Sequence, residues 1–276
     1  MAGITQRARI AVLGGNGRVG RMIMSCGQNH DLISVVRPEK AGPRDVSWAP
    51  GLPFPRDLQC DAVVAAWGVT HGSKSDLDAN VTLVRHAQNF GKAAGAERVV
   101  HCSSAAVYGC KTPWTESVKI NPVSCYGLAK ARMEDAITHA TTGPKAVILR
   151  IGNVAGADSL FKAGLRDGHV TLDRFPDGRG PIRSYIGPRT LTHVTLWAAL
   201  SSETPPFLNV AGASEVGMED IARAMAWHVS WRPATQTAHQ HAVLETDLLQ
   251  KYLHLGDETA QPSSIAEEVN SIVHIL

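Results

Sequence analysis

Three residues of this chain have the types and the spacing that proton and hydride transfer require. Tyr126 and Lys130 stand four positions apart in "SCYGLAK", so on a helix they lie one turn apart on the same face. A free tyrosine has a pKa of about 10, and a nearby ammonium together with a cationic cofactor favours the phenolate. The spacing alone suits an exposed helix face equally well. Ser104 favours the chemical interpretation, because it ends the apolar run "ERVVHCSS" 22 residues before Tyr126.

A glycine-rich segment near the beginning of the chain has the spacing of a dinucleotide-binding turn. "GGNGRVG" follows the short apolar run "RIAVL" and precedes a predicted helix. Small residues let the backbone approach a pyrophosphate, and a helix N-terminus offers free N–H groups and a partial positive charge. We therefore predict that a dinucleotide contacts Gly14, Asn16, Gly17, Arg18, Val19 and Gly20.

The end of the second predicted strand indicates which dinucleotide is used. NAD sites usually carry an acidic residue there, about 20 residues after the glycines, and this chain has Arg37. The planar fork of an arginine pairs well with a 2′-phosphate, and Arg18 in the turn lies within reach of the same group. The sequence favours NADP, while NAD remains the alternative if Arg37 is only a solvated cation at a strand end.

The elements that position these residues follow an alternating pattern. Short apolar strands are predicted at 9–13, 31–38, 60–68, 97–104 and 145–153, with helices between them, including a long one at 76–94 and one beginning near Val123. Strands that alternate with helices over about 150 residues predict an α/β fold with a doubly wound parallel sheet, similar to a Rossmann fold. Ser104 and the glycine turn then lie at the carboxyl edge of the sheet, where such folds bind ligands.

The alternation ends after Asn153. Residues 154–187 are rich in Gly, Pro and charge, as loops over a ligand often are. A helix at 191–201, the strand "FLNVAG" and a helix over "SEVGMEDIARAMAWH" with Ser214 as its N-cap follow. We predict a dinucleotide-binding domain at 1–153 and a small mixed substrate-binding lobe at 154–276, interleaved with the first domain.

With these pieces in order, the chain resembles the extended short-chain dehydrogenase/reductase family, also called the NAD-dependent epimerase/dehydratase family. The matching segments are "GGNGRVG", "ANVTLVRHAQNFGKAAGAERVVHCSSAAVYG", "NPVSCYGLAK" and "LRIGNVAG". The resemblance implies roles for Ser104 as the active-site hydroxyl, Tyr126 as the acid/base, and Lys130 as the ligand of the nicotinamide ribose that lowers the tyrosine pKa. It further implies a cofactor-side role for Asn80 and substrate-side roles for Asn153 and Arg183.

The departures from the family pattern narrow the reaction. Family dehydratases carry an Asp-Glu pair after the active-site hydroxyl, whereas Ala105 and Ala106 follow Ser104 here, so dehydration is disfavoured. The resemblance implies an NAD(P)-dependent oxidoreductase or epimerase that transfers a hydride at a hydroxyl or carbonyl carbon of a sugar-like or other small substrate. A non-catalytic dinucleotide sensor on the same fold is the alternative. By analogy with relatives, the two long helices would pair two subunits into a homodimer.

Composition excludes other classes of partner. A net charge of +2 favours neither nucleic acid nor an anionic membrane, and no apolar run is long enough to cross a bilayer. Five scattered cysteines predict neither disulfides nor a metal site and favour the cytoplasm. We interpret Cys102 and Cys125 as packing residues. The tryptophans Trp67, Trp114 and Trp231 are compatible with a pocket but more often pack in cores.

Overall fold

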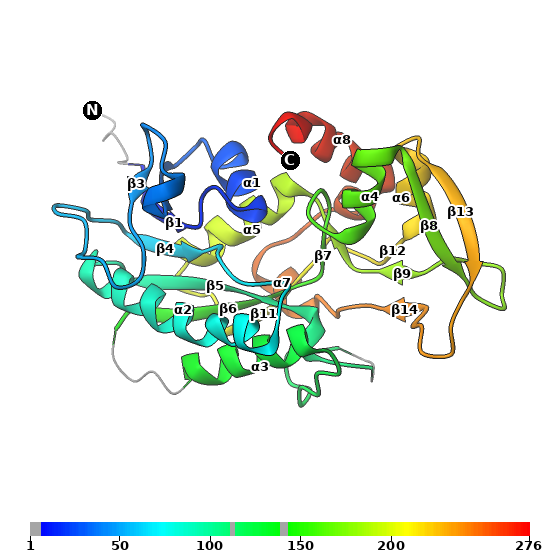
Figure 1. Cartoon of the computed structure of the whole chain (residues 1–276), viewed down its shortest axis with the longest axis horizontal. Helices are drawn as coiled ribbons and strands as arrows, with labels where there is room; N and C mark the ends of the chain where they lie inside the picture. The colour runs from blue at the N-terminus through cyan, green and yellow to red at the C-terminus, as the bar shows by residue number, and fades with distance from the viewer. Residues whose placement is uncertain (1–6, 111–113, 139–142) are drawn as a thin grey trace.

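A parallel seven-stranded sheet forms the centre of the computed structural model, which describes residues 7–110, 114–138 and 143–276 (Figure 1). The strand order is β11-β6-β5-β4-β1-β2-β3. The strands are β1 (Arg9–Leu13), β2 (Asp31–Val36), β3 (Val46–Ser47), β4 (Ala62–Ala65), β5 (Arg98–Ser104), β6 (Lys145–Ile151) and β11 (Phe207–Val210). Their apolar runs are buried because helices cover both faces, as a parallel sheet requires. The predicted doubly wound α/β fold is confirmed.

Four helices cover the two faces of the sheet. Helices α1 (Arg18–Cys26) and α5 (Pro188–Leu200) pack together on one face. Helices α2 (Lys74–Ala93) and α3 (Cys125–Thr138) pack together on the other, at the bottom of Figure 1. The main apolar core lies under α1 and α5 and includes Ile10, Val12 and Leu149, all fully buried.

The chain reverses its direction across the sheet between β1 and β4. After β1 it adds β2 and β3 on one side, then returns to add β4, β5, β6 and β11 on the other. Ligands of open α/β sheets bind outside the carboxyl ends of the strands at such a switch point. The segments that leave β1, β4 and β5 at this edge are the glycine turn, residues 66–72 and the segment that begins at Ala105.

Residues 154–187 hold more regular structure than the loops that the sequence predicts. They contain helix α4 (Ser159–Asp167), whose N-cap Asp158 accepts a hydrogen bond from the backbone N–H of Phe161. The strands there are β7 (Asn153–Val154), β8 (His169–Arg174), β9 (Ile182–Arg183) and β10 (Tyr185–Ile186). These strands are short and pair with distant segments, so their sequence shows no periodicity of its own.

The smaller lobe lies at the right of Figure 1 and combines these strands with the end of the chain. Its later elements are β12 (Val216–Gly217), α6 (Met218–Ala224), β13 (His228–Pro233), β14 (His241–Ala242) and α8 (Pro262–Ile272), whereas α7 (Asp247–Tyr252) packs against β11 of the main sheet. Single 3-10 turns lie at Pro38–Lys40, Ala105–Val107, Asp257–Ala260 and Val273–Ile275. Strand β11 belongs to the main sheet and helix α5 packs on it, although both follow residue 153. The division into two domains at residue 153 stays a prediction. Among the described residues, no helix is both long and apolar enough to span a membrane.

The predicted N-cap at Ser214 is wrong. Helix α6 begins at Met218 and is preceded by Gly217, because Val216 and Gly217 form strand β12 and pair with β9. Val216 is buried in the core of the small lobe. A cross-strand pair between distant residues therefore decides the helix start here, in place of the local capping signal.

Candidate active site

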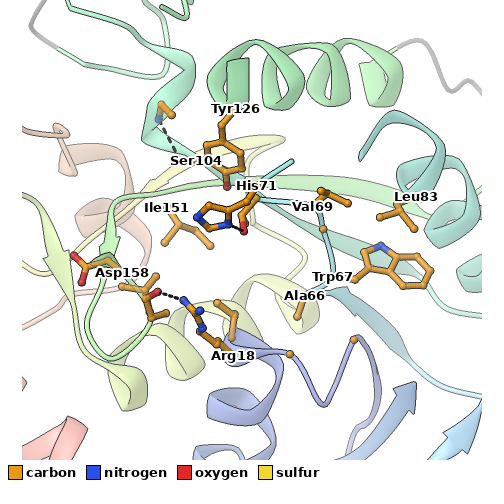
Figure 2. A pocket seen from close by; sticks show the side chains of 18 of the residues that line it. Arg18, Ala66, Trp67, Val69, His71, Leu83, Ser104, Tyr126, Ile151 and Asp158 are labelled. Carbon is orange, nitrogen blue, oxygen red and sulfur yellow. Dashed lines mark hydrogen bonds between the residues drawn. The ribbon is translucent and has the colours of Figure 1, made fainter. Parts of the chain in front are cut away.

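A cavity of about 1220 Å³ opens at the carboxyl edge of the sheet, where the two lobes meet (Figure 2). Pockets for single small ligands are typically about 300–1,000 Å³, so this cavity is larger than most of them. Its walls are the glycine turn, the ends of β2 and β4, the first half of α2, Ser104 and Tyr126, and the small-lobe segment around Asp158. The sequence predicted the residues of the turn and the serine–tyrosine pair at this edge, and the structure brings them to one cavity.

Ser104 and Tyr126 come from different elements and line the same cavity. Ser104 is the last residue of β5, and its Oγ accepts a hydrogen bond from the N–H of Ala106 at 3.2 Å, which fixes the side chain. Tyr126 lies in the first turn of α3, and its hydroxyl points into the cavity in Figure 2. Burial raises the pKa of Tyr126 to about 12, while a hydrogen bond with Ser104 opposes that rise. Burial thus favours the protonated phenol, whereas the predicted role of Tyr126 calls for positive charge close to its hydroxyl.

Lys130 lies one helical turn below Tyr126, as the spacing predicts. Its side chain is 4% exposed, and its Nζ lies 5.9 Å from the centre of the tyrosine ring. The ammonium donates a hydrogen bond to the carbonyl of Cys102 at 2.8 Å. Burial lowers the pKa of Lys130 to about 8. Lys130 thus carries its charge behind the cavity wall, and a ligand group must replace or join the Cys102 carbonyl to reach it.

The glycine turn fits a pyrophosphate. Gly14 has a φ of +82°, and a Cβ on Gly20 would overlap the carbonyl of Gly14, so both positions need glycine. Helix α1 begins after Gly17 with no side-chain cap and no acidic residue in its first turn. Its first N–H groups are therefore available to an anion that approaches from the cavity.

Arg37 and Arg18 do not converge on one group, contrary to the sequence-based expectation. Arg37, at the end of β2, is 67% exposed in its side chain and forms a surface ion pair with Glu39 at 3.3 Å. Arg18 donates instead to the carbonyl of Ala157 at 2.9 Å, across the cavity in the small lobe. The difference arises because the first residue of α1 faces the small lobe, which the sequence does not place.

Asn80 lies behind the cavity wall and does not line it. The side chain is 1% exposed and is bound to backbone on every side. Its Oδ1 accepts from the N–H of Val69 at 3.1 Å, and its Nδ2 donates to the carbonyls of Val69 at 2.9 Å and Leu77 at 2.8 Å. The structure gives Asn80 a positioning role for the segment after β4, and direct contact with a cofactor stays a prediction.

The two predicted substrate-side residues lie on the small-lobe side of the cavity. Asn153 donates from Nδ2 to Asp158 at 2.9 Å, and Tyr185 donates to the same carboxylate oxygen at 2.8 Å. Burial raises the pKa of Asp158 against these hydrogen bonds. Arg183 donates to the carbonyls of Ile182, His239 and Gln240 at 2.7–3.0 Å. Both predicted residues face the cavity, and both already hold the small lobe together.

Positive groups outnumber negative ones around the cavity. The cationic side chains in its lining are Arg18, Arg37, Lys162 and Arg183, and the carboxylate there is that of Asp158. Low-dielectric walls that carry one sign of charge concentrate ligands of the opposite sign. The arrangement therefore suits phosphate-bearing ligands.

Aromatic side chains form the wall beside the glycine turn. Trp67, after β4, stacks on Trp48 with ring centres 6.1 Å apart, and Trp48 packs on Phe90 at 4.9 Å. Trp67 and Trp114 line the cavity, whereas Trp231 packs against Arg174 in the small lobe. The sequence offered each tryptophan as a pocket residue without a means to choose among them. Cys102 is half-buried against the main core, and desolvation raises its thiol pKa to about 11, as expected of a packing residue.

Comparisons with known proteins agree with this site. The family model for the NAD dependent epimerase/dehydratase family matches residues 10–173. The dTDP-6-deoxy-L-talose 4-dehydrogenase (NAD(P)(+)) of Kitasatospora kifunensis is 32% identical over 240 residues, covering 76% of each chain. Two solved structures share the fold. The UDP-Glc/GlcNAc 4-epimerase of Campylobacter jejuni has a TM-score of 0.76 at 17% identity, with 96% of this chain and 98% of that chain covered. The NAD-dependent NDP-hexosamine 5,6-dehydratase TunA has a TM-score of 0.70 at 19% identity, with the same coverage.

The doubly wound sheet with a dinucleotide turn and a Ser-Tyr-Lys set defines a class of nicotinamide-dependent enzymes. Within that class, the chain belongs to the NAD-dependent epimerase/dehydratase family, of the extended short-chain dehydrogenase/reductase type. It is an NAD(P)-dependent oxidoreductase or epimerase that transfers a hydride at a hydroxyl or carbonyl carbon. The alternative of a non-catalytic dinucleotide sensor finds no support in these comparisons.

Proposed function

We propose that this chain is an NADP-preferring oxidoreductase that acts on the sugar of a nucleotide sugar, with Tyr126 as acid/base, Ser104 as the second ligand of the reacting oxygen and Lys130 as the group that tunes the tyrosine. The observation that carries the proposal is the convergence of Ser104 and Tyr126, from β5 and α3, on a cavity whose opposite wall is the glycine turn. Serine alone or tyrosine alone would be an ordinary pocket residue.

The chain's own residues perform the proton part of the reaction. Tyr126 accepts the proton of the substrate hydroxyl during oxidation and returns it to the carbonyl oxygen during reduction. The Oγ of Ser104 accepts from the N–H of Ala106, and its hydroxyl, which hydrogen-bonds Tyr126 in the structure, would donate to the same substrate oxygen. When bound, the nicotinamide accepts or supplies the hydride at the carbon that carries this oxygen.

The positive charge of the cavity supports a nucleoside diphosphate sugar as the substrate. Arg18 and Lys162 line the cavity next to the small lobe, apart from the end of β2 where Arg37 lies. A dinucleotide and a diphosphate substrate each need cationic or N–H donors. Arg37 would serve the dinucleotide at the end of β2, and Arg18 and Lys162 would serve the diphosphate of the substrate near the small lobe. The relative from Kitasatospora is named for a dTDP-deoxysugar, so dTDP-6-deoxy-L-talose is the first substrate to assay.

We propose that the chain is not a dehydratase, although the fold is shared with one. Ala105 and Ala106 follow Ser104 in a short 3-10 turn, where no carboxylate is available for elimination. Epimerase and oxidoreductase differ in whether the hydride returns to the substrate. Net formation of NADPH during the assay identifies an oxidoreductase, whereas product formation without net NADPH identifies an epimerase.

The preference for NADP rests on Arg37. The ion pair between Arg37 and Glu39 is exposed and contributes little to stability. A 2′-phosphate can therefore replace Glu39 as the partner of the guanidinium. We expect NADP to raise the melting temperature more than NAD at equal concentration, since a ligand at 100 times its dissociation constant adds about 2.7 kcal/mol of stability. In Arg37→Gln the advantage of NADP should disappear while the NAD shift is kept. An NAD shift in the wild type without an NADP shift contradicts the preference.

We further propose that two chains pair through α2 and α3 and that the protein works in the cytoplasm. The helices pack side by side on one face of the sheet, and Leu128 of α3 is 42% exposed there. An exposed leucine on a paired helix surface suits an apolar contact between two copies.

The cytoplasmic location rests on the five free cysteines, which favour a reducing compartment.

A further inference from the structure

A histidine that no local sequence motif marks, His71, lies in the candidate active-site cavity. His71 lies between β4 and α2, is exposed, and lines the same cavity as Ser104 and Tyr126. In Figure 2 its imidazole projects into the cavity below the hydroxyl of Tyr126. A side chain at this place contacts whatever sits between the tyrosine and the glycine turn.

The segment that carries His71 is fixed at both ends. On one side the buried amide of Asn80 holds both the N–H and the carbonyl of Val69. On the other side Ser73 begins α2 with a capping box, in which Asp76 accepts from the N–H of Ser73 at 2.8 Å and Ser73 accepts from that of Asp76 at 3.2 Å. His71 therefore lies in a short segment that is hydrogen-bonded at both ends. Because this segment is already ordered, little conformational entropy is lost when a ligand contacts His71.

One ring nitrogen of His71 is already occupied. The Oγ1 of Thr70 lies 2.6 Å from Nδ1, a hydrogen bond in which either group can be the donor. A hydrogen bond at one nitrogen of an imidazole sets which tautomer is present and so decides what the other nitrogen offers. Nε2 is therefore the ring nitrogen of His71 that can hydrogen-bond a ligand.

We propose that His71 is a substrate-binding residue whose Nε2 hydrogen-bonds an oxygen of the sugar beside the carbon that Tyr126 serves. This inference rests on the proposed function, since it needs a sugar in that space. Other polar side chains line the same cavity and are further candidates to contact the sugar, among them Thr82, His86, Ser104, Asn153 and Ser159. His71 contributes a hydrogen bond and takes no proton from carbon.

Two substitutions at this position separate hydrogen bonding from proton transfer. Glutamine places an amide near the former Nε2, whereas alanine leaves nothing there. With dTDP-6-deoxy-L-talose and NADP, we expect His71→Ala to lower kcat/KM by about 10- to 100-fold and His71→Gln to stay within about fivefold of the wild type, since one lost hydrogen bond to substrate is worth about 1–3 kcal/mol. Wild-type activity in His71→Ala, or an equal loss in both variants, overturns the proposal.

A binding measurement decides the question without turnover. Diethyl pyrocarbonate acylates accessible imidazoles, and mass spectrometry reports the modification of each histidine peptide separately. We expect dTDP-6-deoxy-L-talose added with NADP to slow the modification of His71 at least about threefold compared with NADP alone, whereas His254, exposed and outside the cavity lining, is unaffected. Equal modification of His71 with and without the sugar nucleotide overturns the proposal. Protection without turnover would retain the His71 contact and reject the proposed reaction.

Discussion

At the scale of single residues, the site depends on a lysine whose charge is buried. Lys130 is 4% exposed, and no carboxylate forms an ion pair with it among the described residues. Burying a charge in this way is costly unless function requires it. The buried charge therefore fits the proposed role of Lys130 beside Tyr126 better than a purely structural role.

Replacing Lys130 by methionine should separate stability from activity. The pKa of Lys130 is about 8 in the folded protein and 10.5 in its ordinary range, so between these values the unfolded chain holds a proton that the folded protein has lost. The wild type thus gains stability relative to Lys130→Met as the pH rises from 8 to 10.5. We expect the variant to be more stable below pH 8 by on the order of 1 to 3 kcal/mol, a difference that shrinks toward pH 10.5, and to lose turnover.

Urea denaturation of both proteins at pH 7 and pH 10 measures this difference. A variant that is less stable than the wild type at pH 7 would show that the ammonium stabilises the fold through the Cys102 carbonyl instead of straining it.

The sequence could place candidate site residues at one edge of the sheet where a local motif carried the information. Tyr126, Lys130 and the glycine turn are read from spacing within one segment each. His71 was not identified as a site residue because nothing local marks it; its place depends on how the segment after β4 is held by Asn80, whose side chain binds the backbone of Val69. Arg18 was predicted to bind the cofactor beside Arg37, but its partner Ala157 lies 139 positions away in the small lobe.

At the scale of elements, a buried polar network holds the catalytic helix against the sheet. Arg150 of β6 forms an ion pair with Glu134 of α3 at 2.8 Å, and both are almost fully buried. Ser103, next to Ser104 on β5, donates to Glu134 at 2.5 Å, and Arg150 donates to the hydroxyl of Tyr108 at 2.9 Å. The network ties α3, β5 and β6 together just behind Tyr126 and Ser104.

Removing one member of this network should be more damaging than removing two. We expect Glu134→Leu to lower the free energy of unfolding by about 3–5 kcal/mol, because it leaves the guanidinium of Arg150 buried without its partner. The double variant with Arg150→Met should recover most of that loss. Chemical denaturation of the wild type, both single variants and the double variant gives the coupling energy, and additive losses would contradict a direct interaction.

The strands and helices in the first half of the chain were predictable because the parallel sheet is buried on both faces, so its strands appear in the sequence as uninterrupted apolar runs. The strand at 9–13 matches β1 to the residue, and the long helix matches α2 within two residues at its start. The small lobe was not predictable in this way. Its strands β7, β9, β10, β12 and β14 have two residues each and form through pairing with distant segments.

At the scale of the whole molecule, the proposed pairing of two copies through α2 and α3 can be tested directly. We expect light scattering after size exclusion to give about twice the 29.5 kDa chain mass and Leu128→Lys to shift the protein toward the monomer, since a charge opposite its own copy in an apolar contact is unfavourable. The matched control is Tyr252→Lys, which alters an equally exposed apolar residue of α7. A monomeric wild type, or equal effects of both substitutions, would contradict the pairing through these helices.

The central claim concerns both lobes, since we propose that Tyr126 exchanges a proton with a substrate bound on the small-lobe side of the cavity, beside a cofactor bound at the glycine turn. The most direct test is the rate of hydride transfer in Tyr126→Phe with dTDP-6-deoxy-L-talose and NADP, followed by absorbance of NADPH. The phenyl ring preserves the packing against Ser104 and Lys130 but has no proton to exchange. We expect turnover to fall by about 10²- to 10⁴-fold while the thermal shift by NADP is unchanged. A Tyr126→Phe variant with wild-type turnover would contradict the assignment of Tyr126 as the acid/base.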